Sequence, residues 1–395
     1  MPSLGVHKGR RRSGALPPTR FCDFAASQFC CSRSKTKASL CLLRFMQTNG
    51  KKLNPKMETK VLPVNDESIA LAADLLRRGE LVALPTETVY GIAADARNGA
   101  AVKKIFEAKG RPQDNPLIVH ICGMDMLRGI VAEAPERAKK LAAAFWPGPL
   151  TMVLPKGPEV SPVTCAGLDT VGVRMPSNPV VQAVIRRSGV AFAAPSANLS
   201  GRPSPTNAAD TFADMNGRLP LILDGGECTY GVESTVVSLA GEQPVLLRPG
   251  YVTKEQMEQV LGEEVVVSHA ILEKLGDGEV ARSPGMKYKH YAPKAQVTIL
   301  RGSFQAYRKY LAAHAADGVW GLCFDGESAR LPVPCIEYGA EEDPAAQAHR
   351  LFSALRELDR AGAREVYARC PETDGVSMAV YNRLIRAAAF RVVEL

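Results

Sequence analysis

From Asp66 to the C-terminus, short apolar runs alternate with amphipathic segments, a pattern that predicts an α/β fold. The apolar run Leu81–Leu84 predicts a strand that ends at a proline, and apolar side chains from Val102 to Phe106 recur at helical spacing. A second strand is expected at Pro116–His120, after the turn KGRP. This part of the chain therefore predicts a strand–helix–strand unit with polar residues at the strand ends.

The rest of the first domain alternates in the same way. Helices are expected through residues 69–76, 136–145 and 178–187, and strands at 150–154, 171–175, 190–194, 219–223, 234–239 and 244–247. Short strands mixed with helices at these spacings favour a twisted, mixed sheet with helices packed on it.

Residues 268–295 interrupt the alternation and predict a linker rich in glycine, lysine and tyrosine. Long loops of this kind are often lids or binding segments, and a solvated spacer is the alternative. Strands at 297–300, 319–324 and 365–368, with helices at 304–315, 344–361 and 376–389, then predict a smaller three-layer α/β domain over 296–395. The absence of G-x-G-x-x-G there gives no support to a dinucleotide site.

Charge is divided unevenly along the chain. The 395 residues are 46% hydrophobic and 23% charged, and the formal net charge is +8. Residues 1–57 hold twelve Lys/Arg and one acid, so the rest of the chain carries −3. Because the basic charge belongs to this leader and not to residues 58–395, the composition argues against binding of nucleic acid by the folded part. No apolar run approaches ~18 residues, so a transmembrane helix is not expected.

The basic leader, residues 1–57, is predicted to lie outside the mature fold, and the catalytic domain is expected to start at residue 58. It is rich in Arg and Ser, which also suits a mitochondrial transit peptide, but Gly-Arg-Arg-Arg and Pro-Pro interrupt any helix. We favour the interpretation that translation starts at Met57, directly before the first ordered-looking segment.

A protein that starts at Met57 is accordingly expected to keep full activity, because no core or site residue is predicted upstream. The comparison is the specific activity of the full chain and of the truncated chain. Loss of function on truncation would refute this interpretation.

The cysteines predict neither a disulfide framework nor a zinc site. Four of the ten lie in the leader, and the other six are scattered without a C-x-x-C pair. This spacing is typical of reduced thiols in a cytosolic protein.

Cations and hydroxyl groups gather at the predicted strand ends. Lys109 and Arg111 lie in the KGRP turn, and Arg174 and Arg248 close two later strands. Hydroxyl-bearing turns follow other strands, among them PSANLSG from Pro195. Each residue alone could be a cap, a turn or a surface ion pair. Together they predict an α/β enzyme that binds a polyanion, although no G-x-x-x-x-G-K-[ST] loop is present.

Five ordered motifs resemble the YrdC-like domain of threonylcarbamoyl-AMP synthases: PTETVYG, KGRPxxNPLxVH, PSANxSGxPSPT, ESTVV and LRPG. GMKYKHYAP and the α/β domain after it resemble the long, two-domain form, so the likeness covers Met57 to Leu395. Departures are the leader and Lys289, where an arginine is common.

The resemblance implies roles for individual residues. Lys109 and Arg111 would be the catalytic cations that stabilise charge on the phosphates. L-threonine would be held by Thr88, His120, Arg174, the Ala194 backbone and Ser234, and ATP by Lys109, Arg111, Asn115, Thr170, Ser196, Ser204, Arg248 and Tyr291. Tyr291 would reach in from the linker as part of a lid. Mg²⁺ would enter with ATP, and no protein side chain is implied as a metal ligand.

The implied reaction joins L-threonine, bicarbonate or CO2, and ATP into threonylcarbamoyl-AMP and pyrophosphate. A separate tRNA threonylcarbamoyl-transferase complex would then modify an adenosine next to the anticodon. A weak direct contact with tRNA is compatible with the family, and no membrane partner is implied. A cytoplasmic location follows, or a mitochondrial one if the leader is a transit peptide.

Two other functions compete with this interpretation. An RNA-binding module without ATP chemistry would use a basic concavity, and the −3 charge of residues 58–395 argues against it. A carbamoyltransferase of the hydrogenase-maturation type would add C-x-x-C pairs and an acylphosphatase-like segment, and the sequence has neither.

Overall fold

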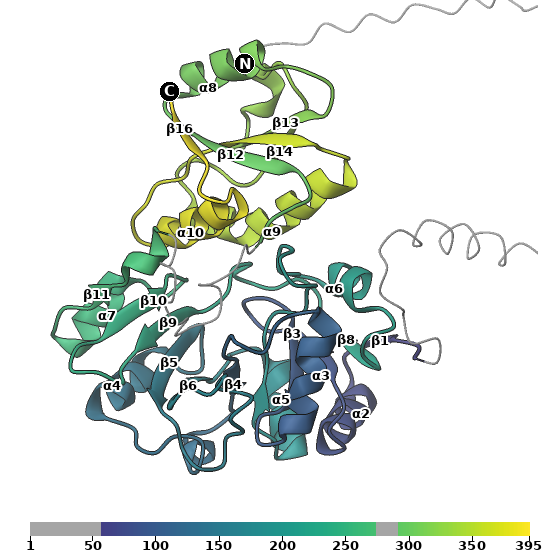
Figure 1. Ribbon diagram of the computed structural model, residues 1–395, viewed down its shortest axis with the longest axis vertical. Coiled ribbons are helices and arrows are strands. Elements are labelled where there is room, and N and C mark those ends of the chain that lie inside the picture. The colour runs from purple at the N-terminus through teal and green to yellow at the C-terminus, as the bar shows by residue number, and fades with distance from the viewer. Residues whose placement is uncertain (1–56, 274–290) are drawn as a thin grey trace, which may run out of the picture. The chain divides into compact units, whose positions relative to one another are not determined.

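The computed structural model describes residues 57–273 and 291–395, which belong to one compact unit with two sheets (Figure 1). The predicted leader, apart from Met57, and most of the predicted linker at 268–295 lie outside the described residues. Within the described segments, no helix combines the length and the apolar character needed to cross a bilayer.

The larger sheet has eleven strands in the order β1-β8-β2-β3-β7-β4-β6-β5-β9-β10-β11. The strands are β1 (Lys60–Pro63), β2 (Val82–Leu84), β3 (Gly91–Asp95), β4 (Ile118–His120), β5 (Leu150–Pro155), β6 (Thr170–Arg174), β7 (Phe192–Ala193), β8 (Leu221–Asp224), β9 (Thr235–Ser238), β10 (Val245–Arg248) and β11 (Val266–Val267). Neighbouring strands pair in both senses: β4 runs parallel to β6, for example, and β5 antiparallel to β6. The predicted mixed sheet is confirmed.

The strand–helix–strand interpretation of residues 81–120 needs a correction. β3 was not predicted; it forms an antiparallel pair with β2 before helix α3 (Gly99–Lys109) begins. As a result, β2 and β4 are not neighbours, because β3 and β7 lie between them. β3 reads GIAAD, and its glycine and alanines give little of the β-branched signal by which strands are recognised.

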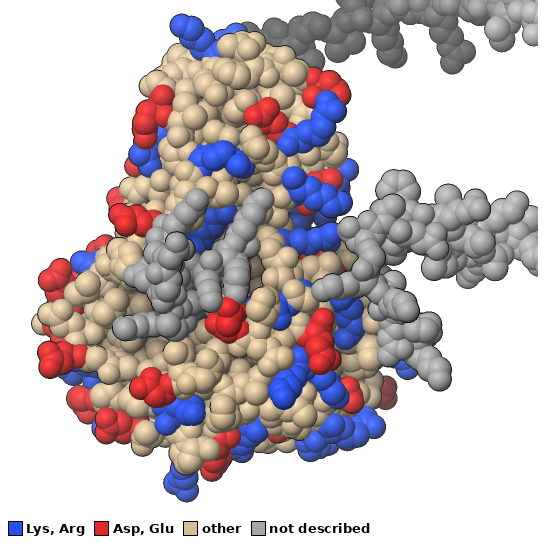
Figure 2. All heavy atoms as spheres, viewed as in Figure 1, with Lys and Arg blue, Asp and Glu red and all other residues tan. Residues whose placement is uncertain are grey.

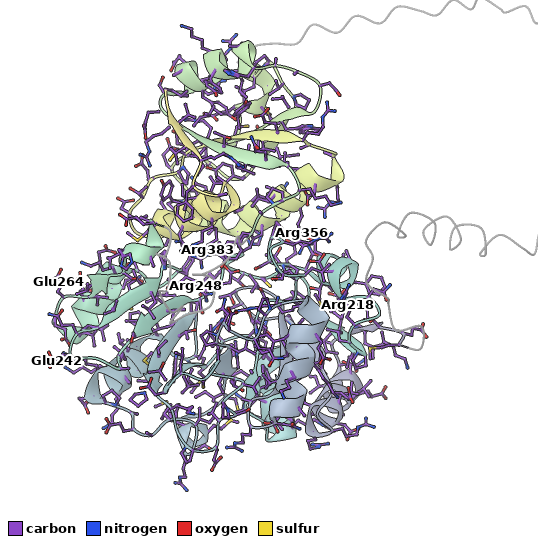
Figure 3. The ribbon with its side chains drawn as sticks, in the orientation of Figure 1. Arg218, Glu242, Arg248, Glu264, Arg356 and Arg383 are labelled. Carbon is purple, nitrogen blue, oxygen red and sulfur yellow. The ribbon has the colours of Figure 1, made fainter. Side chains whose placement is uncertain are left out.

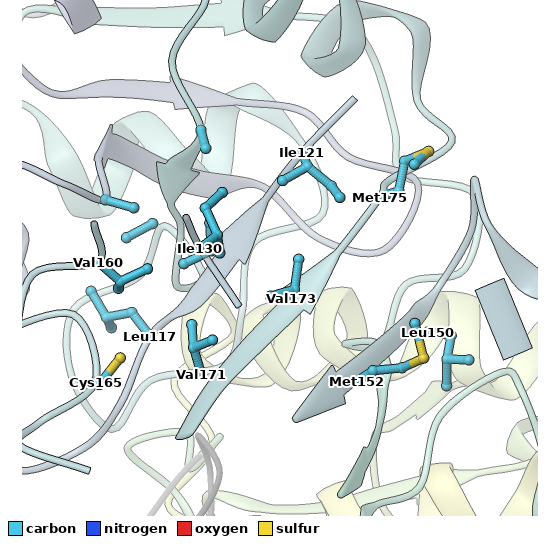
Figure 4. Packing of buried hydrophobic residues seen from close by; sticks show 14 of the residues in the cluster. Leu117, Ile121, Ile130, Leu150, Met152, Val160, Cys165, Val171, Val173 and Met175 are labelled. Carbon is cyan, nitrogen blue, oxygen red and sulfur yellow. The ribbon is translucent and has the colours of Figure 1, made fainter. Parts of the chain in front are cut away.

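Successive side chains on the central strands point alternately to the core and to the opposite face of the sheet, where the cavity lies. On β6, Val171 and Val173 point into the main core, as Figure 4 shows, so Thr170 and Arg174 point to the opposite face. β4 repeats the pattern, because Val119 lies in the same core and His120 on the other face. The polar side chains of Thr170, Arg174 and His120 therefore lie on one face of the sheet.

Helices cover the two faces unequally. α3, α4 (Glu136–Phe145) and α7 (Lys254–Leu261) contribute to the main core on one face, whereas α2 (Asp66–Arg77) and α5 (Pro179–Ser188) pack on the other face beside β2 and β8. α6 (Ala208–Met215) packs against β8. Further along the second face, the cluster of Ile118, Val153, Val236 and Leu247 includes no helical residue. This part of the sheet forms the floor of the candidate site.

The smaller sheet has five parallel strands in the order β14-β13-β15-β12-β16. They are β12 (Gln296–Arg301), β13 (Val319–Cys323), β14 (Cys335–Glu337), β15 (Glu365–Arg369) and β16 (Val392–Glu394). Helix α8 (Phe304–Ala313) packs on one face, and α9 (Pro344–Arg360) and α10 (Ser377–Ala387) pack on the other (Figure 1). The predicted three-layer domain is confirmed, with β14 and β16 as unpredicted edge strands.

Candidate active site

A cavity on the uncovered part of the large sheet gathers most of the predicted site residues. It holds about 730 Å³ of space not occupied by atoms, part of which is open to solvent. Ten of the thirteen predicted residues line it: Thr88, Lys109, Arg111, His120, Arg174, Ala194, Ser196, Ser234, Arg248 and Tyr291. They come from strand ends and turns that are up to two hundred residues apart in sequence. The cavity combines four cationic side chains with several hydroxyl groups.

Lys109 ties the last turn of α3 to the 194–201 turn. Its Nζ donates to the carbonyl oxygens of Ser196 and Asn198, the latter at 2.7 Å, and the side chain is almost fully buried. Ser196 Oγ in turn donates to Asn198 Oδ1 at 2.6 Å. Burial first, and then the nearby Arg111 charge, hold the pKa of Lys109 well below its ordinary value. An anion bound beside Lys109 would oppose both effects and favour the protonated form.

Arg174 is anchored from three sides at the end of β6. Its Nε donates to Gly148 O at 3.2 Å and its Nη1 to Thr88 Oγ1 at 2.9 Å. The Nη2 atom lies 2.6 Å from Glu87 Oε1 in a buried ion pair. That pair is close but poorly aligned, because Nη2 has no hydrogen-bond acceptor in suitable geometry among the described residues. Glu87 was not predicted as a site residue.

Ser234 and Arg248 meet where β9 begins and β10 ends. Arg248 Nε donates to Ser234 O at 3.0 Å, and its Nη2 contacts Ser234 Oγ at 3.1 Å. Ser234 Oγ also lies 2.8 Å from Thr151 Oγ1 on β5. Both hydroxyl side chains are buried, so this corner is rigid before any ligand binds.

Glu233 connects the cavity to the C-terminal domain. Ser204 Oγ donates to Glu233 Oε1 at 2.5 Å, and Arg383 Nε on α10 donates to Glu233 Oε2 at 3.0 Å. Arg383 also donates to the main-chain oxygens of Glu233 and Pro249, and it has no solvent exposure. Figure 3 shows Arg383 and Arg248 where the two domains meet. Ser204 therefore lies behind the cavity wall instead of lining it.

Asn115 and Thr170 also lie outside the main cavity. Thr170 lines a second hollow of about 270 Å³ that shares Ile118 with the main cavity. Thr170 and Arg174 lie on one face of β6, as their spacing predicted, but they reach different hollows. Asn115 is fully buried, and neither its Oδ1 nor its Nδ2 has a hydrogen-bond partner among the described residues. A buried amide without partners is costly unless a ligand supplies them.

Tyr291 follows the part of the linker outside the described residues and lines the cavity. Its backbone is left-handed, with φ of 63°, and its ring packs 5.2 Å from that of Phe352 on α9. The next residue, Ala292, donates its N–H to Gly201 O at 2.9 Å. The linker end is thus joined to the 194–201 turn, and the predicted lid lies outside the described residues.

His120 is held neutral beneath the cavity. Burial, and next the Arg174 charge, lower its pKa from 6.5 to about 3, and its ring stacks on Phe192 at 5.7 Å. Nδ1 lies 3.2 Å from Ile118 O, which favours the tautomer with hydrogen on Nδ1. Nε2 is then an acceptor.

The pKa of His120 predicts a loss of stability in acid. Between pH 6.5 and about 3 the unfolded chain binds a proton that the folded chain does not, so the stabilisation is present above pH 6.5 and is lost on acidification. By about pH 4, wild type should lose about 3 kcal/mol more unfolding free energy than His120→Asn does. Chemical denaturation at several pH values measures this difference. The exposed His314→Asn serves as control, and parallel pH curves for wild type and His120→Asn would contradict the prediction.

Among the described residues, no group of three or more His, Cys, Asp or Glu side chains is arranged to hold a metal ion. Glu233, the one carboxylate that the described residues contribute to the cavity wall, is already bound by Arg383 and Ser204.

Comparison with known proteins identifies relatives over most of the chain. Residues 74–250 match the family model described as "Telomere recombination", and residues 252–389 match the one described as "Threonylcarbamoyl-AMP synthase, C-terminal domain". The threonylcarbamoyl-AMP synthase of Bacillus subtilis is 46% identical over 85% of this chain and 97% of its own length. That of Pyrococcus abyssi is 44% identical over 84% and 97%.

A solved structure agrees with these relatives. The crystal structure of P. abyssi Sua5 complexed with L-threonine has a TM-score of 0.79 at 42% identity, and the alignment covers 85% of this chain and all of that one. The fold and these relatives define an enzyme of the nucleotidyltransferase type. More narrowly, the chain belongs to the threonylcarbamoyl-AMP synthase family, in its two-domain form.

Proposed function

We propose that the protein makes threonylcarbamoyl-AMP and pyrophosphate from L-threonine, bicarbonate or CO2, and ATP. The observation that carries the proposal is the single cavity in which Arg174 lies at one wall and Lys109, Arg111 and Arg248 at others. Such a cavity suits an amino acid and a triphosphate bound side by side.

The threonine site is assigned to the wall made by Thr88, His120, Arg174 and Ser234. Arg174 offers a planar guanidinium to the substrate carboxylate, and neutral His120 can accept a hydrogen bond from a hydroxyl or amine through Nε2. The Ala194 N–H already donates to Ile118 O, so the Ala194 carbonyl is the backbone group proposed to accept a hydrogen bond from the substrate. The binding of L-threonine by the P. abyssi protein supports this assignment.

The nucleotide site is assigned to the cationic walls and the second hollow. Lys109, Arg111 and Arg248 would neutralise the phosphates, with Ser196 beside them in the 194–201 turn. Thr170, beside the second hollow, is proposed to face the nucleotide, and the unpartnered amide of Asn115 would gain partners from it. Ser204 would act through Glu233, and Tyr291 would close the wall at the linker end.

Catalysis in this scheme rests on positioning and charge. The neutral amine of threonine takes up CO2 and releases a proton to give a carbamate, a carbamate oxygen attacks the α-phosphorus, and pyrophosphate leaves. The chain holds the two reactants together and supplies Lys109 and Arg111 to the charge that develops on the phosphates. Mg²⁺ is proposed to enter on ATP and to be held by phosphate oxygens, because Glu233 is already satisfied.

The product would then serve a separate tRNA threonylcarbamoyl-transferase complex. An RNA-binding module without ATP chemistry remains the second candidate. Figure 2 shows Lys/Arg and Asp/Glu interspersed over the visible face, with no continuous basic surface. This distribution favours the enzyme over the RNA-binding module.

Omission of single substrates tests the proposal. Purified protein should release pyrophosphate from ATP only when both threonine and bicarbonate are present. Pyrophosphate release that is independent of threonine, or salt-dependent RNA binding without ATP consumption, would contradict it.

A further inference from the structure

Glu87 is a buried carboxylate directly behind the proposed threonine site. It lies in the turn after β2, its side chain is 6% exposed, and its Oε1 is 2.6 Å from Arg174 Nη2. The mechanism proposed above gives Glu87 no role. Within the motif PTETVYG, only its neighbour Thr88 was predicted to bind a substrate.

Glu87 also binds the segment that leads into α5. Its Oε1 accepts the Ser177 N–H at 3.0 Å and its Oε2 accepts the Asn178 N–H at 3.3 Å. Its main-chain oxygen accepts the Tyr230 N–H at 2.8 Å. One residue therefore joins the end of β6, the start of α5 and the loop before β9.

Electrostatics favour an ionised Glu87. Burial alone would raise the pKa of this carboxyl group, but the Arg174 charge and the Ser177 N–H together lower it below its ordinary value. Arg174 is equally buried, so the two charges compensate each other where neither side chain is more than 6% exposed.

The geometry leaves Arg174 able to bind a further anion. Nε and Nη1 are used by Gly148 and Thr88, whereas Nη2 approaches Glu87 without a well-aligned hydrogen bond. Arg174 lines the cavity and Glu87 does not. The carboxylate thus lies behind the guanidinium, on the side away from the ligand.

We propose that Glu87 is a positioning residue that fixes the Arg174 guanidinium in the orientation that receives the carboxylate of the amino acid substrate. This inference rests on the proposed assignment of Arg174 to threonine. Without the charge of Glu87, Arg174 would keep only its hydrogen bonds to Gly148 and Thr88 and could turn toward the phosphates, so that the amino acid would lose its oriented partner. The effect should therefore fall on threonine and not on ATP.

The test compares wild type with Glu87→Gln, which keeps the shape of the side chain but removes its charge. KM for threonine should rise by about tenfold or more, as expected when a charge-assisted hydrogen bond to a ligand is weakened, while KM for ATP stays unchanged. Glu87→Asp, which keeps the charge on a shorter side chain, should recover part of the affinity. Glu80→Gln, which alters a half-exposed pair with Lys104, is the matched control.

Direct titration of threonine into each protein distinguishes a failure of the Glu87 inference from a failure of the proposed function. If wild type binds threonine and Glu87→Gln binds it equally well, or if KM rises equally for threonine and ATP, Glu87 has only a structural role and the inference is wrong. If wild type itself binds no threonine, the proposed function fails first. Should Glu87→Gln not fold, the KM values of Glu87→Asp decide by the same criterion.

Discussion

Lys109→Ala is expected to slow pyrophosphate release by about 10²-fold or more, because a preorganised cation at the phosphates would be lost. The buried Nζ has two main-chain acceptors in the 194–201 turn, so it is already oriented before ATP arrives. Neutralisation of developing charge by a fixed group in a site of low dielectric has a larger effect than the same charge in water. The measurement is the single-turnover rate at saturating threonine and ATP.

Controls separate the charge of Lys109 from its structural contacts. Lys109→Met fills most of the same volume and should be as slow as the alanine variant while it keeps the wild-type fold. Lys104→Ala, on the same helix but half exposed, should leave the rate unchanged. A near-normal rate for Lys109→Ala or Lys109→Met would refute the assignment.

Arg383→Met is expected to lower the free energy of unfolding by about 3–5 kcal/mol, because the buried Glu233 carboxylate would lose its guanidinium partner and keep only the smaller charge contribution of Arg248. The arginine is fully buried and binds both the carboxylate of Glu233 and the main chain next to Arg248 and Ser234. Activity should fall as well, since these contacts join the two strands that carry those site residues. Denaturant titration and the rate of pyrophosphate release give the two values.

Removal of the Glu233 charge together with that of Arg383 provides the control for Arg383→Met. The double variant with Glu233→Gln should recover part of the lost stability, because no unpaired ion remains. Arg364→Ala breaks a pair with Asp317 in which the two side chains are 69% and 97% exposed; this change should cost less than about 1 kcal/mol. If Arg383→Met is as stable as wild type, the C-terminal domain does not support the site in this way.

A polar residue at the end of an apolar strand could be assigned to the cavity from the sequence alone. Arg174 and Arg248 follow short runs of valine or leucine, and the period of two along β6 fixes which side chains face away from the core. Lys109, the first residue of the KGRP turn and the last residue of helix α3, lines the same cavity.

The partners of these residues could not be predicted. Glu87 and Arg174 are 87 positions apart, and Glu233 and Arg383 are separated by 150, so only tertiary folding brings them together. Arg383 lies on an amphipathic helix whose pattern is equally compatible with a solvated arginine. Ser204 was predicted to touch ATP, but the structure places it against Glu233, one layer behind the cavity.

Several elements escaped prediction: the strands β1, β3, β11, β14 and β16, and the eight-residue helices α6 and α7. They are short or weakly patterned. β3 contains alanine and glycine where strand signals need branched or aromatic side chains, and β14 and β16 are edge strands of three residues each. Their stability comes from pairing with neighbours and not from their own sequence.

A labelled-substrate experiment tests the central claim that one cavity holds the amino acid and the nucleotide for direct joining. Purified protein is incubated with threonine, ATP and ¹³C-bicarbonate, and the nucleotide products are analysed by mass spectrometry. The account predicts an adenylate that contains both threonine and the labelled carbon, in an amount equal to the pyrophosphate released. Pyrophosphate accompanied by AMP or threonyl-AMP without the label would contradict it.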